Sequence, residues 1–171
     1  MAASDRAALT ARFQQLARQD EERRLASFTC DDAWTLGQYA REAYERHSAG
    51  AARRVGVAIQ IHSFDGQVLF ACVVGQGATP RLGEMIRRKI ETVRVYSVSS
   101  YAIGRKLLGQ GKTLDDLGPD HAPHGGAVPI FVRSVGAPVG AIAVSGLSQE
   151  VDHAIAVEAL ERHISAAGPA H

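Results

Sequence analysis

The sequence predicts an α+β fold, in which a central antiparallel sheet of two hairpins is flanked by helices. Apolar residues alternate with small or polar ones on both sides of the Asp65-Gly66 turn, which predicts the first hairpin. Apolar runs on both sides of Gly136-Ala137-Pro138 predict the second. Helical periodicity comes before, between and after these hairpins, so the strands are expected to pair as neighbours beneath a layer of helices.

Length and composition favour one compact domain. The chain has 171 residues, of which 46% are hydrophobic, and this is enough to build a core. Its 19 basic and 18 acidic side chains nearly cancel, which argues against a nucleic-acid partner, and no apolar stretch is long enough to span a membrane. Cys30 and Cys72 lie far apart, and residues 1–20 do not resemble a signal peptide. We therefore expect a cytoplasmic protein with a small-molecule or protein partner.

The N-terminal segment, residues 1–26, is expected to form a charged amphipathic helix. Leu9, Phe13 and Leu16 recur at helical spacing among basic and acidic residues. Such a helix could pack loosely on the domain or join a partner subunit.

The folded domain is expected to cover residues 27–166 and to be followed by a disordered tail, 167–171. Thr29 and Asp32 resemble a capping box at the start of a helix that runs to about Tyr44. Four residues of this helix are expected to face inward: Trp34, Gly37, Ala40 and Tyr44.

The remaining elements follow in order. The first hairpin has strands at about 55–61 and 68–72, and Thr79 and Pro80 then begin a helix that runs to the mid-nineties. After a break at 97–100, a second helical piece reaches Leu108. Residues 112–123 are expected to form a loop, the second hairpin has strands at 127–133 and 139–145, and Ser148 begins the last helix.

Lys89 is the most informative charged residue, because it falls in the middle of an apolar helix face. That face is formed by Leu82, Met85, Ile86, Ile90 and Val93. A lysine at such a position extends its ammonium group to the surface, pairs with a carboxylate or meets an anionic ligand.

Two histidines are further candidates. His124 lies in a loop before Gly125-Gly126, where it could ligate a metal or haem iron, donate a proton or bond to the loop backbone. His153 shares a helical stripe with apolar residues, which favours a partly buried structural role, and Asp152 lies beside it in the first turn, where a carboxylate suits the helix dipole.

Several common sites are disfavoured by the spacing of the residues. Asp120, His121 and His124 lack the helical register of a zinc hydrolase. Ser145 is not within a Gly-x-Ser-x-Gly elbow, and no glycine-rich dinucleotide or phosphate loop occurs. The sequence therefore contains no complete catalytic constellation, and whether the protein is an enzyme is left open.

Four motifs together resemble the haem-degrading domain family, and within it a cytosolic branch for which no reaction is established. They are Arg87-Arg88-Lys89-x-x-Thr92, Ser99-Ser100-Tyr101, His124-Gly125-Gly126-x-x-Pro129-Ile130 and Val144-Ser145-Gly146-Leu147-x-Gln149-Glu150-x-Asp152-His153. The resemblance covers Phe28 to Ile164 and implies a profilin-like fold that assembles into homo-oligomers. The chain departs from the branch pattern at Val98, where a histidine is common, and at Ser148, where a proline is usual.

The resemblance implies that one site binds haem or a related anionic small ligand. Lys89 would meet a propionate, His124 or His153 would lie near the iron, with His124 as the candidate metal ligand, and slow oxidative ring opening could follow. The candidate ligand-binding residues are Lys89, Thr92, Tyr101, His124, Gly125, Gly126, Ser145, Gly146, Asp152 and His153. The alternatives are a non-enzymatic homo-oligomeric assembly or adaptor protein, and a sensor of small acids or nucleotide fragments.

Overall fold

A computed structural model describes residues 2–168 and confirms the α+β class. Within the described part of the chain, five α-helices and four strands follow the predicted order, and one extra strand and one 3-10 turn are present. The elements are α1 (Ala3–Glu22), β1 (Arg24–Leu25), α2 (Cys30–His47), β2 (Val57–Ser63), β3 (Val68–Val74), α3 (Pro80–Tyr96), α4 (Ser100–Gly109), η1 (Leu114–Leu117), β4 (Ala127–Val132), β5 (Gly140–Ser145) and α5 (Gln149–Ala166).

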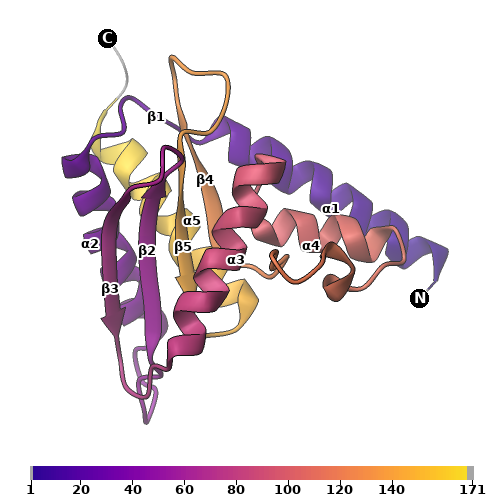
Figure 1. The fold of residues 1–171 in the computed structure, drawn as a ribbon, viewed down its shortest axis with the longest axis horizontal. Coiled ribbons are helices and arrows are strands. Elements are labelled where there is room, and N and C mark those ends of the chain that lie inside the picture. The colour runs from indigo at the N-terminus through magenta and orange to yellow at the C-terminus, as the bar shows by residue number, and fades with distance from the viewer. Residues whose placement is uncertain (1, 169–171) are drawn as a thin grey trace.

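The sheet has the strand order β1-β4-β5-β2-β3 (Figure 1). The two predicted hairpins, β2–β3 and β4–β5, are present and pair with each other through β2 and β5. The expectation of a purely antiparallel sheet is wrong at one edge, because β1 pairs in parallel with β4. A strand of two residues is too short to show an alternating pattern, so no periodicity along the chain marks it.

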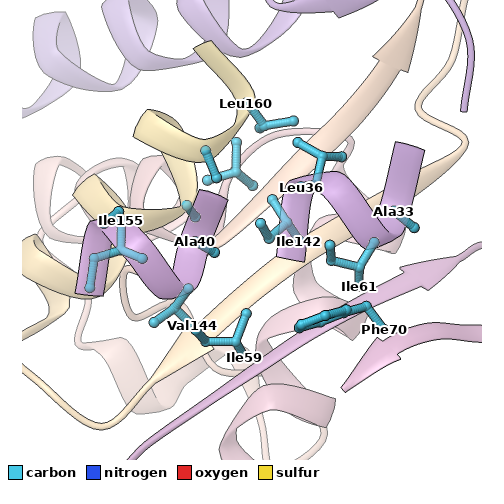
Figure 2. Close-up of a cluster of buried hydrophobic side chains, with 14 of the residues drawn as sticks. Ala33, Leu36, Ala40, Ile59, Ile61, Phe70, Ile142, Val144, Ile155 and Leu160 are labelled. Atoms are coloured by element: carbon cyan, nitrogen blue, oxygen red, sulfur yellow. The ribbon is translucent and has the colours of Figure 1, made fainter. Parts of the chain in front are cut away.

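Helices cover both faces of the sheet, and the two faces differ in side-chain size. Helices α2 and α5 pack on one face, over large aliphatic side chains such as Ile59, Ile142 and Val144 (Figure 2). Helix α3 crosses the other face, where alternate strand residues are alanines, including Ala58 and Ala143. Because alanine is small, α3 can approach the strands closely, and this brings its buried side chains to the sheet surface.

Local signals explain most helix ends. At the start of α2, Thr29 accepts a hydrogen bond from the Asp32 amide at 3.1 Å and Asp32 accepts one from the Thr29 amide at 2.8 Å, which confirms the predicted capping box. Thr79 occupies the N-cap position before Pro80, but its side chain makes no capping bond. The break between α3 and α4 occurs at Ser97, which adopts a left-handed φ of 58°.

The N-terminal helix packs along α4 (Figure 1). Leu16 is buried. Asp20 has no exposed surface, and its carboxylate accepts a 2.7 Å hydrogen bond from the Ser99 amide at the start of α4. The helix ends at Glu22, before the predicted boundary at residue 26, because Arg24 and Leu25 join the sheet. The N-terminal segment is therefore part of the folded unit.

Two further expectations concern the surface of the molecule. Trp34 was expected to face inward and this is wrong: it is 62% exposed, and its ring lies edge-on against Phe70. Of the predicted tail, Ala167 caps α5, and residues 169–171 lie outside the described residues. None of the described helices is both long and apolar enough to cross a membrane.

Candidate functional site

The candidate site is a cleft where β5 ends and α5 begins, beneath the middle of α3. The cleft has a volume of about 220 Å³. Its lining residues are Leu82, Met85, Lys89, His124, Ser145, Gly146, Leu147, Gln149 and Asp152. Two larger grooves, of about 530 and 470 Å³, border α1 and are lined by none of the ten residues that the sequence singled out.

The floor of this cleft is a buried ion pair between Lys89 and Asp152. Their Nζ and Oδ2 atoms are 3.2 Å apart, and each residue is 2% exposed. Nζ also donates a 3.0 Å hydrogen bond to the Val144 carbonyl. Of the three roles that the sequence left open for Lys89, the structure shows pairing with a carboxylate.

Asp152 is fully engaged in this arrangement. Its carboxylate accepts hydrogen bonds from the amides of Gly146 at 3.2 Å and Leu147 at 3.0 Å, in addition to the bond from Lys89. Burial lowers the pKa of Lys89, and the nearby Asp152 carboxylate opposes this effect. An ammonium group has three N–H donors, so the Lys89 side chain retains one after bonding to Val144 and Asp152.

The paired glycines allow the chain to pass this ion pair. Gly126 has a φ of 133°, and a Cβ there would press on the Val144 carbonyl and lie 2.7 Å from Lys89 Nζ. A Cβ on Gly125 would press on the Gln149 carbonyl and lie 3.0 Å from the Tyr101 ring. Only glycine fits between α3, β5 and α5 at these two positions.

His124 stands at the rim of the cleft. Burial lowers its pKa, Lys89 and Arg88 add to this effect, and Asp115 opposes it, so the imidazole is neutral at pH 7. Its Nδ1 is sealed from solvent and has no hydrogen-bond acceptor among the described residues. Because an unpaired N–H costs more than an unpaired lone pair, we assign the proton to Nε2. In that tautomer the ring donates a hydrogen bond outward.

Two more polar side chains line the cleft. Ser145 shares the α3-facing side of β5 with the alanines, and its residue is only 5% exposed. Its hydroxyl has no partner among the described residues. Gln149 accepts a 3.3 Å hydrogen bond from the Gly125 amide through Oε1, which leaves its NH₂ group without a partner in the same range. With Lys89 and His124, four donor side chains therefore border one small space.

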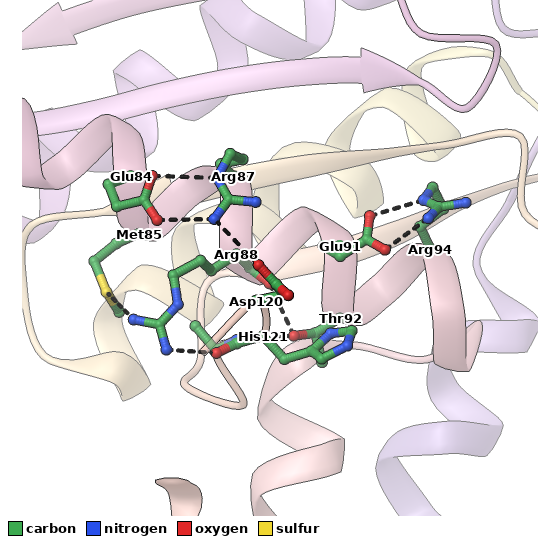
Figure 3. A network of polar contacts seen from close by, with 10 residues as sticks. Glu84, Met85, Arg87, Arg88, Glu91, Thr92, Arg94, Asp120 and His121 are labelled. Carbon is green, nitrogen blue, oxygen red and sulfur yellow. Dashed lines mark hydrogen bonds and ion pairs between the residues drawn. The ribbon is translucent and has the colours of Figure 1, made fainter. Parts of the chain in front are cut away.

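Thr92 does not line the cleft but holds the loop that carries His124. Its hydroxyl donates to the Arg88 carbonyl at 2.9 Å and accepts from the Ala122 amide at 3.0 Å. Arg88 also donates a 2.8 Å hydrogen bond to the His121 carbonyl (Figure 3). This network joins α3 to residues 120–122, and so holds in place the segment that leads into His124.

Tyr101 and His153 are not among the residues that line the cleft, and the Tyr101 ring lies beside Gly125. Their ring centroids are 5.0 Å apart, and the Arg105 guanidinium lies 4.6 Å from the centre of the Tyr101 ring. Burial lowers the pKa of His153 to about 4, with further lowering by Arg23, Arg12 and Lys89. The structure therefore divides the residues that the sequence grouped into one site.

Sequence reasoning missed two residues that organise this region. Ser100 donates a 2.6 Å hydrogen bond to the His124 carbonyl, and its hydroxyl accepts one from the Ala127 amide at 3.1 Å. Gln149 was visible as the first helical residue after the Ser148 cap, a position whose side chain can reach back across the helix start. The sequence showed Ser100 only as part of the Ser99-Ser100-Tyr101 motif beside the helix break.

The donor set at the cleft does not resemble a metal centre. Within residues 2–168, no group of three or more histidine, cysteine, aspartate or glutamate side chains is placed to hold a metal ion. Histidines that ligate metals almost always donate their second N–H to an acceptor, and His124 Nδ1 has none among these residues. The arrangement can donate hydrogen bonds to an anion.

Comparisons with known proteins agree with the fold and with the family that the sequence resembles. A model of the family described as haem degrading protein HbpS-like matches residues 28–161. A UPF0303 protein of Paraburkholderia phytofirmans is 41% identical over 156 residues, which are 89% of each chain. Another UPF0303 protein, from Streptomyces coelicolor, is 41% identical over 152 residues, covering 85% of this chain and 90% of the relative.

Solved structures give the same result. The crystal structure of the Ybr137w protein superposes with a TM-score of 0.79 at 32% identity, covering 91% of this chain and 88% of that one. That of HbpS gives 0.62 at 26% identity, with coverages of 81% and 92%. A structure described as a PduOC:Heme complex gives 0.63 at 19% identity, with coverages of 79% and 94%, and shows a common fold only.

Proposed function

The chain belongs to the family of HbpS-like haem-degrading proteins, and from that premise we propose that its cleft binds the carboxylate of a small anionic ligand. The observation that supports the proposal is that several side chains with unpartnered hydrogen-bond donors line the same cleft. Lys89, His124, Ser145 and Gln149 each have a donor free of protein partners in the described chain, and the single carboxylate, Asp152, is already engaged. The cleft therefore offers donors without a competing acceptor.

The start of α5 adds to this preference for an anion. Ser148 caps the helix, and Gln149 is its first residue, so the positive end of the helix dipole faces the cleft. The apolar side chains of Leu82, Met85 and Leu147 form the remaining wall. A ligand with one carboxylate and a short apolar body suits this combination.

Haem is the ligand that the family suggests, and the cleft suits only part of it. Sites that enclose drug-sized ligands usually measure about 300–1,000 Å³, whereas this cleft measures about 220 Å³. A propionate fits such a space and could meet Lys89 and Ser145, while the macrocycle would lie outside. His124 is not prepared to ligate the iron through Nε2, because its Nδ1 lacks an acceptor among the described residues. We therefore derive no step of oxidative ring opening.

The proposal is tested by comparing three ligands: hemin, hemin dimethyl ester, which lacks free carboxylates, and propionate. Hemin binding is followed in the Soret region and propionate binding by calorimetry. We expect saturable binding of propionate and, if hemin also binds, at least tenfold weaker binding of the ester, because its carboxylates are blocked. Binding of propionate alone would identify a free small acid as the ligand. Equal binding of hemin and its ester, with no propionate binding, would overturn the proposal.

Matched variants locate the binding. Gln149→Glu keeps the oxygen that accepts from the Gly125 amide but places a negative charge in the cleft, so it should weaken binding by about tenfold or more. His47→Ala, at the far end of α2, is the control and should have no effect. Binding that responds equally to both variants would contradict a site in the cleft.

A second candidate, assembly of identical chains, is favoured by the edge strand β3. Within residues 2–168 this strand pairs only with β2, and it contains no charged residue. Val68 and Val73 are 56% and 60% exposed on it. Uncharged, exposed edge strands readily pair with another chain. Light scattering should show an oligomer that Val73→Lys disrupts, and a monomeric wild-type protein would exclude this candidate.

A further inference from the structure

Two buried nitrogens without partners lie outside the cleft, in the cluster of Tyr101, Arg105 and His153, which we call the Tyr101 cluster. They are Arg105 Nε and His153 Nδ1. His153 is 8% exposed, so it is buried without a hydrogen bond among the described residues. A buried polar side chain without a partner is uncommon in native proteins and needs a physical explanation.

The position of the His153 proton follows from its surroundings. Nδ1 is buried from solvent and has no acceptor among the described residues. Nε2 is not fully buried, and it also has no protein partner in the described range. The less costly neutral tautomer places the proton on Nε2, where it can be donated to a group that arrives from solvent. His153 is therefore an outward-facing donor on a nearly buried ring.

The Tyr101 ring fixes the other donor. The Arg105 guanidinium lies on the ring at 4.6 Å, and the His153 ring lies 5.0 Å from it. Both groups contact the same aromatic ring, so the cluster brings a guanidinium and an imidazole to one side chain. It offers a held guanidinium and an imidazole N–H.

The surrounding charges are predominantly positive. The charged groups that act on His153 are Arg12 and Arg23 of α1 and Lys89 of α3. Three of the carboxylates on the packed elements are already paired, because Asp20 and Glu161 bond to Arg23 and Asp152 bonds to Lys89. Glu22 of α1 and Glu150 of α5 have no ion-pair partner among the described residues, and both are exposed to solvent. Arg12 and Arg105 have no carboxylate partner among residues 2–168. An anion at this position would compensate them.

We propose that the Tyr101 cluster is a second binding site, which takes a compact oxyanion such as inorganic phosphate or a phosphomonoester. His153 Nε2 and the Arg105 guanidinium donate hydrogen bonds to its oxygens, and Arg12 supplies further positive charge. Arginine guanidinium groups suit phosphate because several N–H donors lie in one plane. This site does not depend on the carboxylate proposed for the cleft.

The test is a titration of the full-length protein with inorganic phosphate, followed by NMR of the histidine rings. We expect saturable shifts of the His153 ring and a rise of its pKa by about one unit, because a bound anion favours the imidazolium. Arg105→Met and Arg12→Gln should each weaken phosphate binding by about tenfold. Arg12 is exposed, so its variant reports on binding even if Arg105→Met alters the packing of Tyr101.

Two controls separate this site from phosphate binding elsewhere on the protein. Arg18→Met removes an exposed positive charge from another part of α1 and should leave phosphate binding unchanged. Gln149→Glu, designed to disable the cleft, should also leave it unchanged. Linear shifts that do not saturate, or equal losses in Arg18→Met and Arg105→Met, would indicate an adventitious ion only and overturn the proposal.

Discussion

Asp152 and His153 are neighbours in sequence and both are buried, yet their surroundings are opposite. The Asp152 carboxylate accepts three hydrogen bonds, from Lys89, Gly146 and Leu147. The buried Nδ1 of His153 has no partner within the described residues. Successive helix residues point about 100° apart, so one turn of α5 faces the cleft and the Tyr101 cluster at once. Burial therefore does not distinguish a structural group from a candidate ligand, whereas the number of partners does.

The largest effect on stability is expected when the partner of Asp152 is removed. Lys89→Met leaves a charged carboxylate buried without its cation, which should lower the free energy of unfolding by about 3–5 kcal/mol, measured by urea denaturation. Adding Asp152→Asn should recover part of the loss, because an amide carries no charge. The exposed pair of Arg94 with Glu91 is the control, and Arg94→Met should change little. Similar losses in Lys89→Met and Arg94→Met would contradict a structural role for the buried pair.

The next test concerns the pH dependence contributed by His153. Its pKa is about 4 in the folded protein and about 6.5 in the unfolded chain, so the unfolded state binds a proton first as the pH falls. Stability should therefore decrease between pH 6.5 and 4, by about 3 kcal/mol from this group. His153→Gln should be less sensitive to pH than the wild-type protein in phosphate-free buffers.

Gln14→Ala provides the control for that experiment, since Gln14 is an exposed residue of α1 that does not titrate. It should retain the pH dependence of the wild-type protein. The comparison fails if His153→Gln and Gln14→Ala give the same profile.

The smallest effect is expected at Asp20, a buried carboxylate with one close donor. Asp20→Ala leaves the Ser99 amide without its acceptor and should cost about 1–3 kcal/mol, whereas Asp20→Asn should cost less because its carbonyl can still accept. Burial raises the pKa of Asp20, so its contribution to stability is present at acid pH and is lost as the pH rises through the folded value. Urea denaturation at pH 4 and 7 checks both effects, and an Asp20→Ala protein as stable as the wild type would contradict them.

Sequence reasoning found the fold because each main element has a local signal. Alternation marks the hairpins, and Thr29 and Ser148 mark helix starts by capping. The prediction for Trp34 was wrong because helical periodicity shows which side of a helix faces the sheet but not how far the sheet extends. Strand β3 of Phe70 is the edge of the sheet, and the indole is 62% exposed there. The strand β1 was missed because its pairing with β4 is entirely long-range.

For the site, the sequence identified the buried Lys89 but not how the candidate residues divide. The apolar helix face indicated that the side chain must find a partner, and Asp152 provides it. The separation of Tyr101 and His153 from the cleft depends on where α4 and α5 meet across Gly125. No spacing along the chain contains that information, because it arises from packing between distant elements.

The most direct test of the account is to map the amide shifts of the protein in two NMR titrations, one with propionate and one with phosphate. Propionate should shift the amides of Gly146, Leu147 and Gln149 around the cleft, and Gln149→Glu should abolish these shifts. Phosphate should act instead on Tyr101, Arg105 and His153. Shifts of both groups by either ligand, or no saturable propionate shift around the cleft, would contradict the assignment of a carboxylate-binding cleft.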